Sequence, residues 1–275
     1  MEWIVVLLGI GLIAGAIGSV IGLGGGIIIV PALLFFSTNT DILDGITPQV
    51  AVGVSTVIMI FTGLSSTLAY MKHKTVDYKS GLIFFAGCGP GGIIGAYANK
   101  ALDLHAFNVY FGSFVILVSI ILMIKDRLKP LSLKENIKIR KKFVDKDGNE
   151  HTYGFNPITA IIISFAVGFC SGIFGIGGGS LIVPTMILLF LFPPHVAVAT
   201  SMFIVFLSSL TNSITHITLG NVNWPYAFAL IPGAWFGAKI GAFINTKLKS
   251  ATLVNFLRIL LLFIGLRLII QGING

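Results

Sequence analysis

Two glycine-rich segments contain residues whose types and spacing could form a ligand-binding site. Gly22-Leu-Gly-Gly-Gly26 is followed by Pro31, and Gly175-Ile-Gly-Gly-Gly179 is followed by Pro184. Four glycines in five positions disfavour a helix, because each costs about 1 kcal/mol relative to alanine. A break in an apolar helix frees backbone N–H groups, and N–H groups at a helix N-terminus attract anions. We expect an anion to be held by Gly22, Gly24, Gly25, Gly26, Gly175, Gly177, Gly178 and Gly179.

The alternative interpretation of these glycines is close packing of helices through small residues. That interpretation accounts well for Gly91 with Gly95 and for Gly237 with Gly241. It accounts poorly for three consecutive glycines that occur twice. Residues 22–26 (the first motif) and residues 175–179 (the second motif) are therefore interpreted as breaks in helices.

Hydroxyl side chains follow each motif at matching places. A hydroxyl donor suits an oxyanion, because it binds the anion without adding a full opposing charge. The alternative is that each hydroxyl bonds a carbonyl group of its own helix. We expect donors to the anion from Ser55, Thr56, Thr200 and Ser201.

The elements that must position these residues are apolar. Of the 275 residues, 55% are hydrophobic and 10% are charged, and the mean hydropathy is +0.97. A soluble domain has about 25% charged residues, so this surface must face lipid. The sequence predicts an all-α integral membrane protein, multi-pass in the cell (inner or plasma) membrane, with about 8–10 transmembrane segments. Its apolar runs lie at about 3–36, 49–71, 80–99, 106–124, 156–192, 195–218, 225–246 and 251–270.

The chain also repeats itself. A shift of 153 residues places the first motif on the second, and a shift of 146 residues then places Asn99 on Asn245. One duplicated unit explains this agreement better than chance. We expect a first transmembrane repeat at residues 1–125 and a second at 156–275, joined by a basic cytoplasmic loop at 126–155.

The connecting loop explains the net charge of +8. Nine of the eighteen basic residues lie between Lys125 and Lys146, as the positive-inside rule expects of a cytoplasmic loop. No nucleic-acid partner is therefore expected. Alternating residues around Asp147-Gly148 predict a β-hairpin in this loop.

Two interpretations remain for how the two halves are oriented in the membrane. Matching loops tend to carry opposite charge bias, which favours an inverted repeat in which each broken run crosses and returns, with about five segments per half. A parallel repeat with eight spans fits Arg267 near the C-terminus better. We prefer the inverted arrangement.

The charged residues indicate the sign of a bound ligand. All ten acidic residues occur at or before Glu150, at segment edges or in loops. A cation transporter usually places a carboxylate inside the membrane, so this pattern favours an anion. Lys239 lies within an apolar run, where it either neutralises the anion or extends to the membrane surface. Three further polar residues are interpreted as structural, with a role at the site left open: Cys88, Cys170 and His216.

The sequence does not contain the motifs of known enzyme classes. The two glycine motifs lack the Lys-Ser/Thr pair that completes a phosphate-binding P-loop, and neither of them follows a strand. No His-Glu-x-x-His segment and no pair of intramembrane carboxylates occurs. We expect no enzymatic activity, no cofactor and no metal site.

The spacing Gly15-(x6)-Gly22-x-Gly24-Gly25-Gly26-(x4)-Pro31 recurs from Gly168 to Pro184. This doubled pattern resembles the sulfite exporter TauE/SafE family, and the resemblance covers nearly the whole chain. It implies a membrane permease for small sulfur-containing anions. We expect a secondary transporter, an exporter of sulfite or an organosulfonate, that binds its anion between the two repeats.

Three other functions remain as alternatives. They are an anion channel, an uptake permease for another organic anion, and a membrane scaffold in which the glycines serve only helix packing. The identity of the anion, the direction of transport, coupling to protons and self-association into a homo-oligomer are left open.

Overall fold

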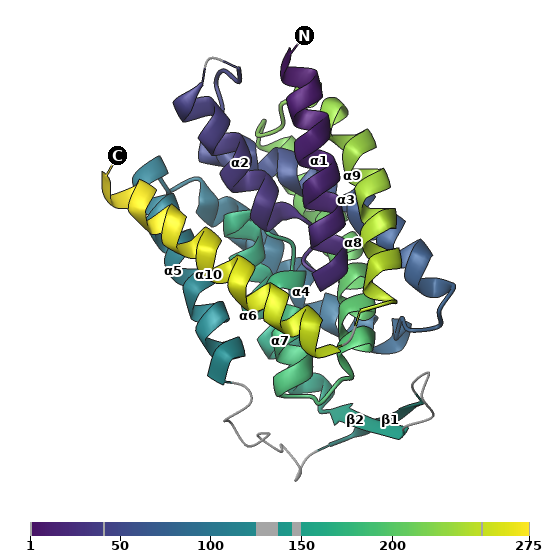
Figure 1. Cartoon of the computed structure of the whole chain (residues 1–275). Coiled ribbons are helices and arrows are strands. Elements are labelled where there is room, and N and C mark those ends of the chain that lie inside the picture. Colours follow the sequence, from purple (N-terminus) through teal and green to yellow (C-terminus); the bar gives the residue numbers. More distant parts are fainter. Residues whose placement is uncertain (1, 41, 125–136, 145–149, 249, 275) are drawn as a thin grey trace.

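The structure is a computed structural model that describes residues 2–40, 42–124, 137–144, 150–248 and 250–274. Figure 1 shows the helices packed in one bundle, with a pair of strands at its lower end. In chain order the elements are α1 (Glu2–Ile21), α2 (Gly26–Asn39), α3 (Pro48–Met71), α4 (Tyr78–Asn99), α5 (Leu104–Ile124), β1 (Ile139–Val144), β2 (Glu150–Phe155), α6 (Pro157–Phe174), α7 (Gly179–Leu188), α8 (Pro194–Thr218), α9 (Trp224–Asn245) and α10 (Ser250–Asn274).

Among the described residues, six helices are long and apolar enough to cross a membrane: α1, α3, α4, α6, α8 and α9. The fold class that the sequence predicts, an all-α integral membrane protein, is confirmed. Helix α2 has 14 residues and α7 has 10, whereas a full crossing needs about 20. Each short helix follows a glycine motif, so both motifs divide an apolar run into a long and a short helix.

Glycines let the two halves interlock. Helix α1 packs along α9, and α4 packs along α6. A Cβ atom on Gly237 would lie 2.1 Å from the carbonyl oxygen of Leu12, and one on Gly91 would lie 2.2 Å from that of Phe165. These approaches are too close for any side chain, so the packing interpretation of these glycines is confirmed. Gly241 meets α1 in the same way.

Two equivalent helices, α3 and α8, pack side by side in opposite directions. Gly53, near the start of α3, lies against the carbonyl group of Asn221, just beyond the end of α8. Gly63, further along α3, lies against Phe206 in the middle of α8. In Figure 1, α1 starts at the upper end marked N, while α6 starts at the lower end beside β2.

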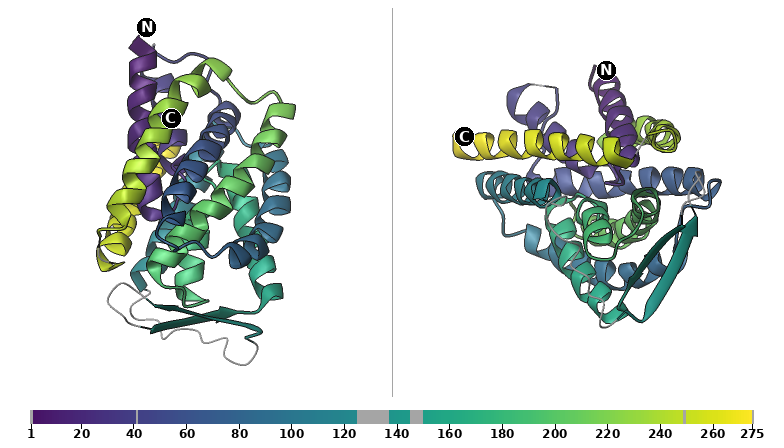
Figure 2. Two further views of the ribbon diagram at one scale, coloured as in Figure 1. Left: turned by 90° about the vertical axis from the view of Figure 1, so that its right-hand side faces the viewer. Right: turned by 60° about the horizontal axis from the view of Figure 1, so that its bottom comes forward.

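Strands β1 and β2 form an antiparallel pair between the halves, from Ile139 opposite Phe155 to Val144 opposite Glu150. Figure 2 shows this hairpin lying across one end of the helices. The turn that the sequence predicts at Asp147-Gly148 lies outside the described residues. One face of β2 packs on the bundle, because Tyr153 and Phe155 are buried.

Candidate functional site

The two glycine motifs reverse the course of the chain. Gly22, Gly24 and Gly25 have φ angles of 80°, 77° and 92°, and Gly175 and Gly177 have φ angles of 65° and 63°. This left-handed region strains any residue with a side chain, which explains the choice of glycine. Each motif therefore ends one helix and starts another in a different direction.

The motifs from the two halves meet each other. A Cβ atom on Gly26, the first residue of α2, would lie 2.2 Å from the carbonyl oxygen of Gly175. One on Gly179, the first residue of α7, would lie 2.1 Å from the carbonyl oxygen of Gly22. The structure thus brings the predicted glycine residues of both motifs together at one junction.

Within the part of the chain that the structure describes, no side-chain cap is found at the start of either short helix. Gly25 precedes α2 and Gly178 precedes α7, and neither has a side-chain hydrogen bond to the first turn. The first N–H groups of a helix have no partner within the helix, and they carry the positive end of its dipole. Two uncapped N-termini at one junction form a positive environment without charged side chains.

The predicted serine donors bind backbone instead of facing open space. Ser55 donates to the carbonyl oxygen of Gly175 at 2.7 Å, and Ser201 donates to that of Gly22 at 2.9 Å. Each bond links a helix of one half to the motif of the other. The hydroxyl protons are thereby used, so these serines brace the motifs and do not present a free donor.

The predicted threonine donors also have partners within the protein. Thr56 donates to the carbonyl oxygen of Gly53 in its own helix at 2.8 Å. Thr200 accepts a hydrogen bond from the backbone N–H of Asp77 at 3.0 Å. The bonding of Thr56 agrees with the alternative interpretation for hydroxyl residues, in which the hydroxyl bonds its own helix.

Lys239 lies away from the junction. Its side chain is exposed on α9, while Gly237 and Gly241 on the same helix face α1. The structure therefore does not bring Lys239 to the motifs, and its position agrees with extension of the amine toward the membrane surface.

Sequence reasoning missed two apolar residues that lie against both motifs. A Cβ atom on Gly24 would lie 2.7 Å from Cγ1 of Val205, and one on Gly177 would lie 2.7 Å from Sδ of Met59. Both residues are fully buried. Met59 and Val205 are themselves related by the shift of 146 residues, which is the signal that could have identified them.

The asparagines that mark the repeat have a defined structural role. Asn245 donates through its side-chain amide to the carbonyl oxygen of Val20 at 2.6 Å. Asn99 donates to that of Ile173 at 2.7 Å. These carbonyl groups lie at the ends of α1 and α6, which the motifs terminate. Each half therefore caps the broken helix of the other.

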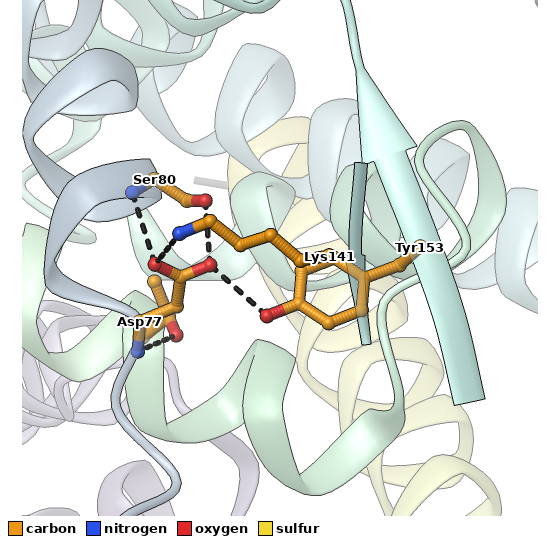
Figure 3. A network of polar contacts seen from close by, with 5 residues as sticks. Asp77, Ser80, Lys141 and Tyr153 are labelled. Atoms are coloured by element: carbon orange, nitrogen blue, oxygen red, sulfur yellow. Dashed lines mark hydrogen bonds and ion pairs between the residues drawn. The ribbon is translucent and has the colours of Figure 1, made fainter. Parts of the chain in front are cut away.

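A polar network attaches the hairpin to the bundle, as Figure 3 shows. The Asp77 carboxylate, at the start of α4, pairs with the Lys141 ammonium of β1. It also accepts from Tyr153 of β2 at 3.0 Å and from the Ser80 hydroxyl at 2.6 Å. Burial alone would raise the pKa of Asp77, but the bonds from Lys141 and Ser80 outweigh it and hold that pKa below its ordinary value. Burial and the Asp77 carboxylate raise the pKa of the Tyr153 phenol.

The hairpin also contacts the second half. The backbone N–H of Gly154 donates to the carbonyl oxygen of Phe190 at 3.2 Å. Phe155 packs edge-on against Phe84 of α4 with ring centroids 5.3 Å apart, and Tyr153 lies 4.3 Å from the ring of Phe192. The hairpin thus connects the start of α4 to the segment between α7 and α8.

Fold and site together are those of a multi-pass membrane protein with two repeats that meet at a glycine-lined junction. The family model described as sulfite exporter TauE/SafE matches residues 7–268. The chain belongs to this family, as the doubled glycine pattern predicts.

Similar proteins are named as probable membrane transporters. The "Probable membrane transporter protein YunE" of Bacillus subtilis is 58% identical over 98% of both chains. A "Probable membrane transporter protein" of Methanocaldococcus jannaschii is 28% identical over 94% of this chain and 92% of its own. No solved structure matches the chain. The chain is a membrane transporter of the TauE/SafE type and not an enzyme.

Proposed function

We propose that the chain is a secondary transporter that exports a small sulfur-containing anion, such as sulfite or an organosulfonate. The anion binds where the two glycine motifs meet, between the repeats. The description of the family supports the substrate class. The single observation that carries the site is the meeting of two uncapped helix N-termini, α2 and α7, at one buried junction.

Physical chemistry favours an anion at this junction. The partial positive charge at a helix N-terminus stabilises negative charge, and the effect is stronger where water is excluded. The described acidic residues lie at helix ends, in loops or in the hairpin, so none opposes an anion at the junction. In this proposal the backbone of both motifs makes the contacts, while Ser55 and Ser201 hold that backbone in position.

The antiparallel course of α3 and α8 supports an inverted repeat made of residues 1–125 and 156–275. In such proteins one repeat moves against the other around a fixed central site, which opens the site to each side in turn. The hairpin within residues 126–155 contacts both repeats, so it would respond to this movement. The basic residues around it favour the cytoplasmic side.

The proposal is tested with the purified chain in proteoliposomes loaded with radioactive sulfite. We expect sulfite outside the vesicles to accelerate exchange, and methanesulfonate to compete more strongly than chloride. An imposed pH gradient shows whether a proton accompanies the anion. Flux without acceleration by external sulfite would indicate a channel, and the absence of any sulfite or sulfonate flux would contradict the proposed function.

A further inference from the structure

Buried polar groups without partners collect beside the second motif. Six polar residues of α4, α6 and α8 are at most 1% exposed: Cys88, Ser164, Ser171, Ser208, Asn212 and His216. Among the described residues, no hydrogen-bond partner exists for Oγ of Ser164 and Ser171, Oδ1 of Asn212 or Nε2 of His216. Unpaired polar atoms inside a membrane protein are costly, so several together indicate that something else completes their bonds.

This polar cluster begins at the N-terminus of α7. A Cβ atom on Gly178, the residue before α7, would lie 3.4 Å from Sγ of Cys88 and 3.9 Å from Oγ of Ser208. The backbone at Gly178 therefore faces these two side chains with little between them. Ser164 lies beside the Cys88 thiol from α6.

The cluster continues for two more turns of α8. Asn212 packs on Gly92, which lies one turn beyond Cys88 on α4; a Cβ atom on Gly92 would be 2.1 Å from Oδ1 of Asn212. His216 follows one turn later, with its Nδ1 atom 3.4 Å from the Asn221 amide. The unpaired groups thus form a strip that leads away from the helix N-terminus.

The positions that the repeat makes equivalent to this cluster carry no unpaired polar atom among the described residues. The positions equivalent to Ser164, Ser171 and Cys88 are occupied by residues without polar side chains: Gly11, Gly18 and Ala234. The equivalents of His216 and Asn212 are bonded within the protein. The Tyr70 hydroxyl donates to the carbonyl oxygen of Ser19 at 2.7 Å. The Ser66 hydroxyl donates to the side-chain hydroxyl of Ser19, also at 2.7 Å.

We infer that this polar cluster, together with the N-terminus of α7, is the binding pocket for one small sulfur oxyanion, so that the site is asymmetric although the fold is repeated. The inference rests on the proposed function and places its anion on the α7 side of the junction between the motifs. Hydroxyl, amide, imidazole and thiol groups are neutral hydrogen-bonding groups, and no described carboxylate lies among them. Such a set replaces the hydration of an oxyanion without fixing it by a full opposing charge.

The test measures the thermal stability of the full-length protein against the concentration of sulfite or methanesulfonate. The variants are Ser164→Ala and Asn212→Leu, with Ser66→Ala and Tyr70→Phe as controls at the equivalent positions of the first half. Without ligand, Ser164→Ala and Asn212→Leu should melt close to the wild type, because Oγ of Ser164 and Oδ1 of Asn212 have no hydrogen-bond partner among the described residues. Their half-maximal stabilisation should require at least a tenfold higher ligand concentration.

The controls should behave in the opposite way. Ser66→Ala and Tyr70→Phe lose bonds within the protein, so they should melt lower without ligand and keep the wild-type concentration dependence. If the wild type responds to ligand and the Ser164 and Asn212 variants respond at the same concentration, the cluster holds only water and the inference is wrong, while the proposed function stands. If the wild type responds to neither anion, the proposed function itself fails.

Discussion

At the scale of single residues, hydroxyl groups hold the junction of the motifs together. Ser55 and Ser201 are related by the repeat, and each crosses to a carbonyl group of the opposite motif. Those carbonyl groups lie where a helix has ended, so no helical N–H group is available to them. The two serines therefore satisfy backbone that would otherwise be unpaired inside the membrane.

We expect Ser55→Ala and Ser201→Ala to destabilise the protein to a similar extent. Each leaves a buried carbonyl group without its partner, which costs about 1–3 kcal/mol. Thermal melting in detergent measures the effect. Thr211→Val is the matched control, because the Thr211 hydroxyl bonds only Ser208 of its own helix. Equal melting temperatures for all three variants would show that the hydrogen bonds between the repeats stabilise the protein no more than a bond within one helix.

The sequence predicts this site in part. The motifs, their pairing and the equivalence of Asn99 with Asn245 follow from the repeat alone. The bonds of Ser55 and Ser201 do not, because the sequence shows that a hydroxyl is near a motif without showing which atom it reaches. Lys239 illustrates the same limit, since its distance along the chain from Gly237 does not reveal that it faces outward.

At the level of elements, the hairpin lies between the two repeats and belongs to neither of them. It rests on the start of α4 through Asp77 and on the segment before α8 through Phe190. A two-stranded hairpin is marginally stable by itself, so these contacts must hold it. The alternating sequence predicts the strands, but Asp77 lies too far along the chain from Lys141 for any pattern to pair them.

Replacing Asp77 should loosen the hairpin in a pH-dependent way. The pKa of Asp77 is lower in the folded protein than its ordinary value of 3.8, so the ionised carboxylate contributes stability above that pH. This contribution is lost as the pH falls through the folded pKa. Asp77→Asn should therefore lower the free energy of unfolding at neutral pH by about 1–3 kcal/mol, and the melting temperature should fall with it. The difference from the wild type should disappear in acid.

Glu150→Gln serves as the control for this experiment. Glu150 pairs with Lys142 at 3.2 Å, but both side chains are more than 60% exposed, and exposed ion pairs contribute little. Limited proteolysis at neutral pH reports on the hairpin directly, and it should cut Asp77→Asn faster than Glu150→Gln. A melting difference for Asp77→Asn that stays constant from neutral to acidic pH would contradict the role of the carboxylate.

At the level of the whole molecule, we propose that the two halves face opposite sides of the membrane. With five membrane segments per half, the hairpin lies on one side of the membrane and both chain ends lie on the other. A parallel repeat of eight spans would place the hairpin and both chain ends on the same side. In cells, a cysteine introduced by Val144→Cys into a Cys88→Ala, Cys170→Ala background should resist an impermeant maleimide, while an alkaline phosphatase fused after Gly275 should be active.

The opposite result would support the parallel arrangement. Val144 is a suitable reporter because its side chain is more than half exposed at the end of β1. An inactive phosphatase together with a protected Val144→Cys would place the hairpin and the C-terminus on the same side and would contradict the inverted repeat.

Sulfite exchange by Gly178→Ala tests directly whether the uncapped N-termini at the glycine motifs hold the anion. Gly178 has a helical φ of −54°, and an added Cβ atom would make only ordinary contact, at 3.4 Å from Cys88. The variant should therefore fold. Gly9→Ala is the control, because a Cβ atom there meets nothing within 4 Å. In proteoliposomes, Gly178→Ala should exchange sulfite at least about tenfold more slowly than the wild type and Gly9→Ala, a loss of about 1.4 kcal/mol or more. Wild-type exchange by a folded Gly178→Ala protein would contradict the account.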